Sequence, residues 1–198
     1  MNIILASQSA ARATMLSAAG VIFTPVAADI DEDKIKANFM ARAPSPKDLA
    51  TELAAAKAQS LVGRYPTSCI IGCDQTLECQ DGRLLNKALS LAELGEQLRQ
   101  LSGQSHWLHS ASTVFEESKQ TWAAAESVRL KMRVLSAAFV DEYVARFCSS
   151  VLGCVGGYQI EGAGVQLFEQ IEGSHFAIMG MPLLPLLAFL RDRGIMMS

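Results

Sequence analysis

The chain has little net charge, few cysteines and no long apolar run, and each of these shortages excludes a class of protein. Its 198 residues include 17 Lys and Arg against 20 Asp and Glu, a formal net charge of −3. This balance argues against a nucleic-acid-binding protein, because such proteins carry a basic surface. The most apolar stretch, residues 176–190, contains prolines and is too short to cross a bilayer. Since residues 1–9 lack the features of a secretory signal, we expect a cytoplasmic protein without nucleic-acid or membrane partners.

The five cysteines have no C-x-x-C spacing, and the sequence contains neither a G-x-G-x-x-G motif nor a P-loop. The missing glycine motifs remove the usual dinucleotide-binding and Walker-type phosphate sites. Without a secretion signal, we expect the thiols to be reduced. A zinc site from Cys69, Cys73 and Cys79 is the alternative, but these residues alternate within predicted strands, which favours buried packing.

Half of the residues are apolar, which excludes intrinsic disorder and provides ample material for a core. Predicted strands and helices interleave, and a hairpin around Asp81-Gly82 interrupts them, so the pattern indicates an α/β fold with a mixed sheet. We expect one domain over residues 1–198, or one with a second lobe whose boundary the sequence does not place. The predicted strands are residues 1–6, 68–80, 83–85, 106–115, 121–135 and 165–169. The predicted helices are residues 10–19, 47–61, 91–101, 137–147 and a C-terminal helix ending at Gly194.

Ser7, Ser9 and Arg12 lie where the first predicted strand passes into a helix. A helix N-terminus presents unpaired N–H groups and the positive end of the helix dipole, which suits a phosphate. The two hydroxyl groups add donors, and the guanidinium adds a charged fork one turn along. The alternative is that Ser9 only caps the helix and Arg12 is solvated.

Lys57 and Asp74 are charged residues in apolar surroundings. At about 100° per residue, Lys57 falls within the apolar stripe of its helix, so its amine either reaches the surface or meets an anion. Asp74 follows an apolar run, where a carboxylate is costly unless it is paired, hydrogen-bonded or bound to a metal. Open α/β sheets bind ligands beyond the carboxyl ends of their strands, so we predict a catalytic acid at Asp74, with a turn-forming aspartate as the alternative.

Glu32, Lys87 and Glu161 are candidates that their local patterns do not select. Glu32 would supply a second carboxylate, but it belongs to a run of four acids in five residues that is more often a solvated loop. Lys87 follows the hairpin, where lysines are usually solvated. Glu161 lies in the glycine-rich stretch 153–164, whose backbone can approach a ligand closely.

Taken in order along the chain, these segments resemble the Maf family of nucleoside triphosphate pyrophosphatases. The matching segments are LASQSAAR at the start, DIDE ending at Glu32, LAAAKAQSL around Lys57, IIGCDQTL around Asp74, LLNK ending at Lys87, LSGQSH, GYQIEGAGVQLFEQIEG and MGMPLLPL. The resemblance implies the family's α/β fold, which is an elongated mixed sheet flanked by helices around a central nucleotide-binding cleft. It also implies a homodimer, since members of the family are often dimeric.

The implied reaction is hydrolysis of the bond between the α and β phosphates of a nucleoside triphosphate, giving a monophosphate and pyrophosphate. Glu32 and Asp74 would hold a divalent cation, Mg²⁺ or Mn²⁺. Asp74 would also orient or deprotonate the attacking water. The residues that would bind the phosphates are Ser7, Ser9, Arg12, Lys57 and Lys87.

Within the family, the chain is similar to the 7-methyl-GTP pyrophosphatase branch. Gln75 follows the aspartate and Glu161 lies in the late glycine loop, as in that branch. The family sets base preference at three positions, and Gln75 and Glu161 take two of them. The third position is Ala11, where that branch carries a bulky aromatic residue. The alternatives are a pyrophosphatase that prefers dTTP, UTP or ITP, and a non-catalytic nucleotide-binding regulator of cell division, because the family is also associated with septum formation.

Overall fold

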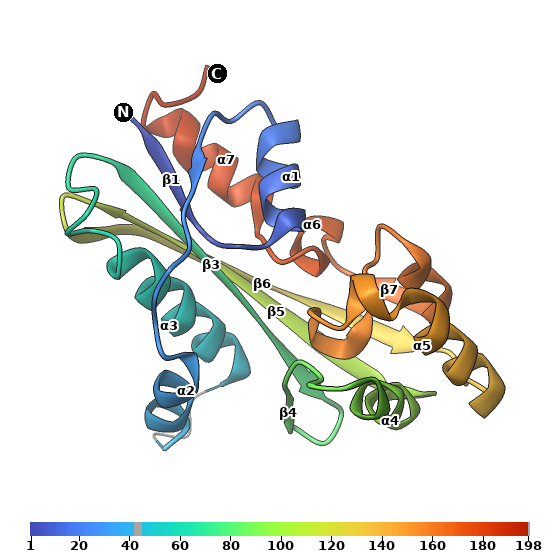
Figure 1. Ribbon diagram of the computed structural model, residues 1–198. Coiled ribbons are helices and arrows are strands. Elements are labelled where there is room, and N and C mark those ends of the chain that lie inside the picture. The colour runs from blue at the N-terminus through green and yellow to red at the C-terminus, as the bar shows by residue number, and fades with distance from the viewer. Residues whose placement is uncertain (42–44, 198) are drawn as a thin grey trace. The chain divides into compact units, whose positions relative to one another are not determined.

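Figure 1 shows a computed structural model of the chain, in which residues 1–41 and 45–197 are described. Within these residues, seven strands form one mixed sheet with the order β2-β1-β3-β5-β6-β7, and β4 pairs with β3. Helices flank the sheet, which confirms the α/β class. The strands are β1 (Ile3–Ala6), β2 (Thr24–Pro25), β3 (Cys69–Cys79), β4 (Leu84–Leu85), β5 (Ser105–Glu116), β6 (Lys119–Met132) and β7 (Phe168–Glu172). The helices are α1 (Ala10–Ala18), α2 (Glu32–Met40), α3 (Pro46–Gln59), α4 (Leu91–Leu101), α5 (Ala137–Val151), α6 (His175–Ile178) and α7 (Leu183–Asp192), with the 3₁₀ helices η1 (Val155–Gly157) and η2 (Ala163–Leu167).

The chain forms two compact units, and each unit is assembled from segments that are far apart in the sequence. The first unit is drawn from Met1–Gln75, His109–Glu126 and Ser174–Ser198, and the second from Thr76–Leu108 and Ser127–Gly173. Strands β3, β5 and β6 each contribute residues to both units. Because the chain passes back and forth between the units, no single point along the sequence separates them.

In the first unit, β1 pairs in parallel with β2 on one side and with β3 on the other. Helix α1 connects β1 to β2, and it packs with α7 in the hydrophobic cluster that contains Leu16, Ile71 and Leu186. Helix α3 precedes β3 and packs in a different cluster, which contains Ala58 and Ile70. Ile70 and Ile71 are adjacent in β3, so the two clusters lie on opposite faces of the sheet. The connections therefore diverge at β1, which puts a topological switch point at its carboxyl end.

Serine caps set the beginnings of several helices, as the sequence predicts. Ser9, Ser45 and Ser90 each accept a hydrogen bond from the backbone amide three residues further on. Gly20 follows α1 with a φ of +80°, the left-handed conformation that commonly ends a helix.

The second unit has its own buried core. Strand β7 pairs antiparallel with β6, with Ile171 opposite Leu130, and β4 pairs antiparallel with β3, with Leu85 opposite Leu77. The fully buried side chains of this unit come from strands and helices alike and include Leu77, Leu94, Leu98, Leu108, Leu130 and Tyr143.

Two expectations from the sequence are wrong. The sequence pattern predicts no helix at residues 32–40, but α2 begins there within the largely exposed acidic run, because Asp31 caps it by accepting a hydrogen bond from the Lys34 amide. The strand expected at residues 165–169 begins only at Phe168, because η2 occupies the preceding residues. The turn there is tight, since a Cβ on Gly164 would lie 2.5 Å from the Gln159 carbonyl oxygen.

No helix in the described part of the chain combines the length and the apolar character needed to cross a membrane.

Candidate active site

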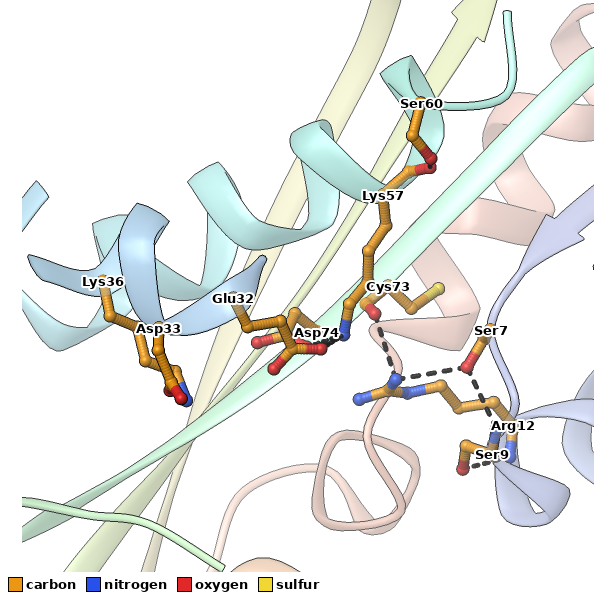
Figure 2. A network of polar contacts seen from close by, with 10 residues as sticks. All are labelled: Ser7, Ser9, Arg12, Glu32, Asp33, Lys36, Lys57, Ser60, Cys73 and Asp74. Atoms are coloured by element: carbon orange, nitrogen blue, oxygen red, sulfur yellow. Dashed lines mark hydrogen bonds and ion pairs between the residues drawn. The ribbon is translucent and has the colours of Figure 1, made fainter. Parts of the chain in front are cut away.

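The site begins where β1 ends and the chain passes through Ser7 into α1 (Figure 2). The Ser9 amide donates to Ser7 Oγ at 3.2 Å, and the Arg12 amide donates to Ser9 Oγ at 3.4 Å. Ser7 is buried, whereas Ser9 and Ala11 are partly exposed beside the first turn of the helix. Both hydroxyl groups therefore lie at a helix N-terminus, where unpaired N–H groups and the helix dipole favour an anion.

Arg12 is buried, which excludes the alternative of a solvated side chain. Its Nε donates to the Gly180 carbonyl oxygen at 2.8 Å, and its Nη1 donates to the Cys73 carbonyl oxygen at 3.0 Å and to Ser7 Oγ at 3.3 Å. Gly180 has a φ of +98°, and a Cβ there would lie 2.9 Å from Arg12 Nε, so the contact requires glycine. Arg12 Nη2 makes no hydrogen bond to a described residue, which leaves one arm of the guanidinium for an anion.

Helix α3 brings Lys57 to β3 because the two elements are in direct backbone contact at Gly72. A Cβ on Gly72 would lie 2.0 Å from the Ala54 carbonyl oxygen and 2.9 Å from the Ala58 amide nitrogen. Lys57 lies between these two contacts on the same helix, one residue before Ala58. A glycine in the strand therefore sets the approach that lets the lysine reach the next carboxylate along β3.

Lys57 Nζ lies 2.5 Å from Asp74 Oδ1 and 2.8 Å from Glu32 Oε1, and Figure 2 shows both carboxylates directed at the amine. The exposed fraction of the side chain is 13% for Lys57, 10% for Asp74 and 41% for Glu32. Of the two alternatives for Lys57, the structure thus has the anion contact. Buried charges require such partners because desolvation is costly. Asp74 Oδ2 makes no hydrogen bond within the part of the chain that the structure describes.

Asp74 lies within β3, which continues to Cys79, so it does not end its own strand. The neighbouring strand β1 stops at Ala6, whose partner in β3 is Gly72. Asp74 therefore lies two residues beyond the parallel pairing. The strand that ends here is β1, and its carboxyl end is the topological switch point, which is where open α/β sheets bind ligands.

Gln75 follows Asp74 and is tied to other elements of the first unit. Its Nε2 lies 2.9 Å from Ser110 Oγ, from the Ala177 carbonyl oxygen and from the Ile178 carbonyl oxygen. Ser110 Oγ itself donates to the Ala177 carbonyl oxygen at 2.6 Å. Because backbone carbonyls only accept, they fix the amide with its nitrogen toward α6. Sequence reasoning missed this link between β3, β5 and α6, because no local pattern reveals partners a hundred residues away.

Lys87 and Glu161 belong to the second unit, and both are exposed. Burial raises the pKa of the Cys154 thiol, Glu161 raises this pKa further, and Lys87 lowers it. Both residues therefore lie within electrostatic range of Cys154. The second unit thus brings together one predicted phosphate-binding residue and one residue predicted to set base preference.

Glu32 and Asp74 have the right chemistry to hold a divalent cation. Their oxygens converge on one positive centre, the Lys57 ammonium, so together they bracket a position for a cation. Mg²⁺ usually takes one or two carboxylates plus substrate phosphates, and this pair fits that donor set. Among residues 1–41 and 45–197, no group of three or more His, Cys, Asp and Glu residues is placed to hold a metal ion. Cys69 and Cys73, considered for zinc, lie in the hydrophobic core.

The fold and the site define a class: an α/β protein in which two serines and a buried arginine at a helix N-terminus adjoin a strand that carries a lysine–carboxylate cluster. The sequence pattern of the family described as Maf-like protein matches residues 2–193. The chain therefore belongs to the Maf-like protein family.

Curated relatives extend over nearly the whole chain. A protein of Sphingopyxis alaskensis named nucleoside triphosphate pyrophosphatase is 43% identical over 98% of this chain and 98% of its own length. A protein of Bartonella quintana named 7-methyl-GTP pyrophosphatase is 42% identical over 98% of this chain and 96% of its own length. Among solved structures, a protein of Mycobacterium abscessus described as a nucleoside-triphosphatase and dITP/XTP pyrophosphatase matches with a TM-score of 0.43 and 14% identity, over 98% of this chain and 96% of that one.

Proposed function

We propose that the chain hydrolyses nucleoside triphosphates to a nucleoside monophosphate and pyrophosphate. The names of its curated relatives, which match almost end to end at over 40% identity, support this activity. The observation that carries the proposal is the cluster of Lys57, Asp74 and Glu32, linked through the Cys73 carbonyl oxygen and Arg12 to the N-terminus of α1. Such a site combines groups that bind phosphate with a carboxylate oxygen able to accept a proton.

The triphosphate would bind at the N-terminus of α1. Ser7 and Ser9 supply hydroxyl donors there, and Arg12 supplies its remaining terminal nitrogen. The other nitrogens of Arg12 are fixed by carbonyl and hydroxyl oxygens, so the guanidinium is oriented before the ligand arrives. Lys57 and Lys87 would neutralise further phosphate charge. In phosphoryl transfer, positioning and charge stabilisation of this kind supply most of the catalysis.

Asp74 would act on the attacking water. Before a nucleotide binds, Lys57 pairs with Oδ1, while Oδ2 lacks a partner among the described residues and can accept a hydrogen bond from water. In the reaction, the water oxygen bonds to the α phosphorus, the bond from that phosphorus to the α–β bridging oxygen breaks, and pyrophosphate leaves with the bridging oxygen. The proton lost by water passes to the Asp74 carboxylate and then to solvent. When Mg²⁺ or Mn²⁺ is bound, Glu32 and Asp74 would hold it, and it would stabilise charge on the phosphates.

The base would be selected by Ala11, Gln75 and Glu161. The exposed carboxylate of Glu161 can accept hydrogen bonds from the N1–H and amino groups of a guanine. We therefore propose a guanine nucleotide, with 7-methyl-GTP as the modified form that the Bartonella quintana relative's name suggests. The small Ala11 offers no ring to stack on the base, so GTP and ITP belong in the same comparison.

Pyrophosphate release from 7-methyl-GTP, GTP, dTTP, UTP, CTP and ITP, with Mg²⁺ and with Mn²⁺, tests the proposal. Asp74→Asn removes the proton acceptor and keeps the shape, so we expect turnover to fall by roughly 10²- to 10⁴-fold. Asp33→Asn is the matched control, because its side chain is 97% exposed and pairs with Lys36 at 3.9 Å, outside the contacts that Lys57 makes. Full activity of Asp74→Asn would contradict the mechanism. Nucleotide binding without turnover of any nucleotide would favour the non-catalytic regulator.

A further inference from the structure

The lysine–carboxylate cluster already contains a cation, which is the ammonium group of Lys57. We propose that Lys57 is a tethered counter-ion that occupies the position a divalent metal needs, so that the metal binds tightly only when nucleotide phosphates draw the ammonium away. This inference rests on the proposed function, because it takes Glu32 and Asp74 as the metal-binding carboxylates. It adds an order of events to that function: metal and nucleotide load together.

The first argument is spatial. Lys57 Nζ is 2.8 Å from Glu32 Oε1 and 2.5 Å from Asp74 Oδ1, so it fills the space between the two oxygens (Figure 2). A Mg²⁺ ion held by the same oxygens would need to lie about 2.0–2.1 Å from each. The ammonium would therefore compete with the metal for the same two oxygens, and the two positive charges would repel each other at this short range. One must leave for the other to bind.

The second argument concerns charge. One ammonium against two carboxylates leaves a single negative charge on the cluster. A metal arriving alone therefore meets half the opposing charge that the bare carboxylates would present. Lys57 and Asp74 are largely buried, so solvent screens their pairing only weakly. The cluster is consequently a poor site for free metal.

The third argument is that Lys57 has somewhere else to go once the nucleotide is bound. Its flexible four-carbon stem lets the ammonium change partners without moving the helix. The cluster is joined to the N-terminus of α1 through Arg12, whose Nη1 contacts both Ser7 Oγ and the carbonyl oxygen of Cys73. Phosphates bound at this terminus would offer the ammonium a new anionic partner. The two carboxylates would then be released to the metal.

The test is a Mn²⁺ titration of the full chain by electron paramagnetic resonance, without nucleotide and with α,β-methylene-GTP. We expect the wild type to bind Mn²⁺ weakly alone and more tightly with the analogue, by roughly 5- to 150-fold, the usual span of a coupling between two ligands. In Lys57→Met, Mn²⁺ alone should bind more tightly by a factor in the same range, and the analogue should add less. Lys57→Arg keeps the charge and should retain weak binding of free Mn²⁺.

Lys36→Met is the matched control, because it removes the same charge from α2 at a side chain that is 30% exposed. It should change Mn²⁺ affinity far less than Lys57→Met does, because Lys36 pairs with the exposed Asp33. Lys57→Gln serves as a second neutral variant, and thermal unfolding with and without Mn²⁺ checks folding and binding together, since a ligand of the folded state raises its stability.

Equal or weaker Mn²⁺ binding by both neutral variants, relative to the wild type and Lys36→Met, would overturn the inference. Pyrophosphate release is measured separately on the wild type. Normal turnover with unchanged Mn²⁺ affinity in the variants would remove this inference alone. Tighter Mn²⁺ binding in the variants, together with no turnover of any nucleotide by the wild type, would support the counter-ion and remove the proposed reaction.

Discussion

The two units hold their functional candidates in different ways. In the first unit, Lys57 and Asp74 are largely buried and contact each other, so their positions are set before any ligand binds. In the second unit, Lys87 and Glu161 are exposed on irregular segments. For the proposed reaction, a carboxylate that is already in place favours Asp74 as the group that acts on water, because catalytic groups gain most from fixed geometry. Exposed side chains on irregular segments can change conformation, so binding of a ligand would set the positions of Lys87 and Glu161.

One of the buried polar residues of the second unit, His106, serves a different purpose. His106 is fully buried, and its Nε2 lies 2.7 Å from the Tyr158 hydroxyl oxygen, while Phe168 packs edge-on against Tyr158 at a centroid distance of 4.8 Å. Its Nδ1 has no hydrogen-bond partner among the described residues. The first unit therefore buries charges beside a counter-charge or hydrogen-bond acceptors, whereas the second buries a neutral ring in an aromatic core.

Among substitutions that test the difference between the two units, we expect the largest loss of stability from Gly72→Ala in the first unit. The new Cβ would lie 2.0 Å from the Ala54 carbonyl oxygen, and this backbone atom cannot move without shifting α3. We expect a loss of about 3 kcal/mol or more in the free energy of unfolding, measured by urea denaturation. Pyrophosphate release should also fall in the folded protein, because α3 carries Lys57.

Two other glycines are the controls for this substitution. Gly63→Ala meets nothing within 4 Å and should change stability by less than about 0.5 kcal/mol. Gly157→Ala, in the second unit, has a φ of +71° and meets the flexible Leu94 side chain, so it should cost about 1–2 kcal/mol. A cost for Gly72→Ala no larger than that for Gly157→Ala would contradict the backbone contact between α3 and β3.

The second prediction concerns pH and the second unit. Burial lowers the pKa of His106 from 6.5 to about 4 in the folded protein. Between these pH values, His106 binds a proton in the unfolded chain but not in the folded chain. The free energy of unfolding therefore falls as the pH drops from 6.5 to 4, by about 3 kcal/mol in total. Above pH 6.5 the histidine is neutral in both states, and this pH dependence vanishes.

Urea denaturation at several pH values between 7 and 4 measures this slope. His106→Gln should reduce the slope, and the exposed His175→Gln should keep that of the wild type. An unchanged slope in His106→Gln would show that the acid sensitivity arises elsewhere, such as in the paired carboxylates of the first unit.

The smallest change in stability is expected for Lys87→Met. The side chain is exposed, so the free energy of unfolding should stay within about 0.5 kcal/mol of the wild type. KM for the preferred nucleotide should rise roughly tenfold with little change in kcat, the result expected for a group that binds without entering the chemical step. Lys119→Met, on the exposed β5–β6 hairpin, is the control. A fall in kcat alone would place Lys87 among the reacting groups.

Local signals predicted much of the fold. Serine caps gave the beginnings of α1, α3 and α4, and Gly20 gave the end of α1, because both depend on residues within one helical turn. The hairpin of β3 and β4 followed from Asp81-Gly82 for the same reason, and Gly82 has a φ of +84°. The sequence placed Lys57 on an apolar helix face, and this placement holds. It placed Asp74 at the end of a buried strand, whereas β3 continues past Asp74 to Cys79.

The pairings between distant segments could not be predicted in the same way. Nothing in its acidic run distinguishes Glu32 from its neighbours until α2 directs it at Lys57. Arg12 has the sequence context of a solvated residue, but acceptors 61 and 168 residues away bury it. Gln75, predicted to set base preference, is also held by α6, and its part in base selection stays a prediction.

By itself, the sequence determined where most of the strands and helices begin, which faces are apolar and which helix terminus could suit an anion, because these features depend on neighbours within a few positions. Only the tertiary structure decided which charges meet. Gly72 lets α3 approach β3, and that approach turns a lysine that might have reached the surface into the partner of Asp74. The physical reason is that a buried charge needs a counter-charge, as Lys57 has, or hydrogen-bond acceptors, as Arg12 has, and these partners are supplied by packing between segments that are far apart in the sequence.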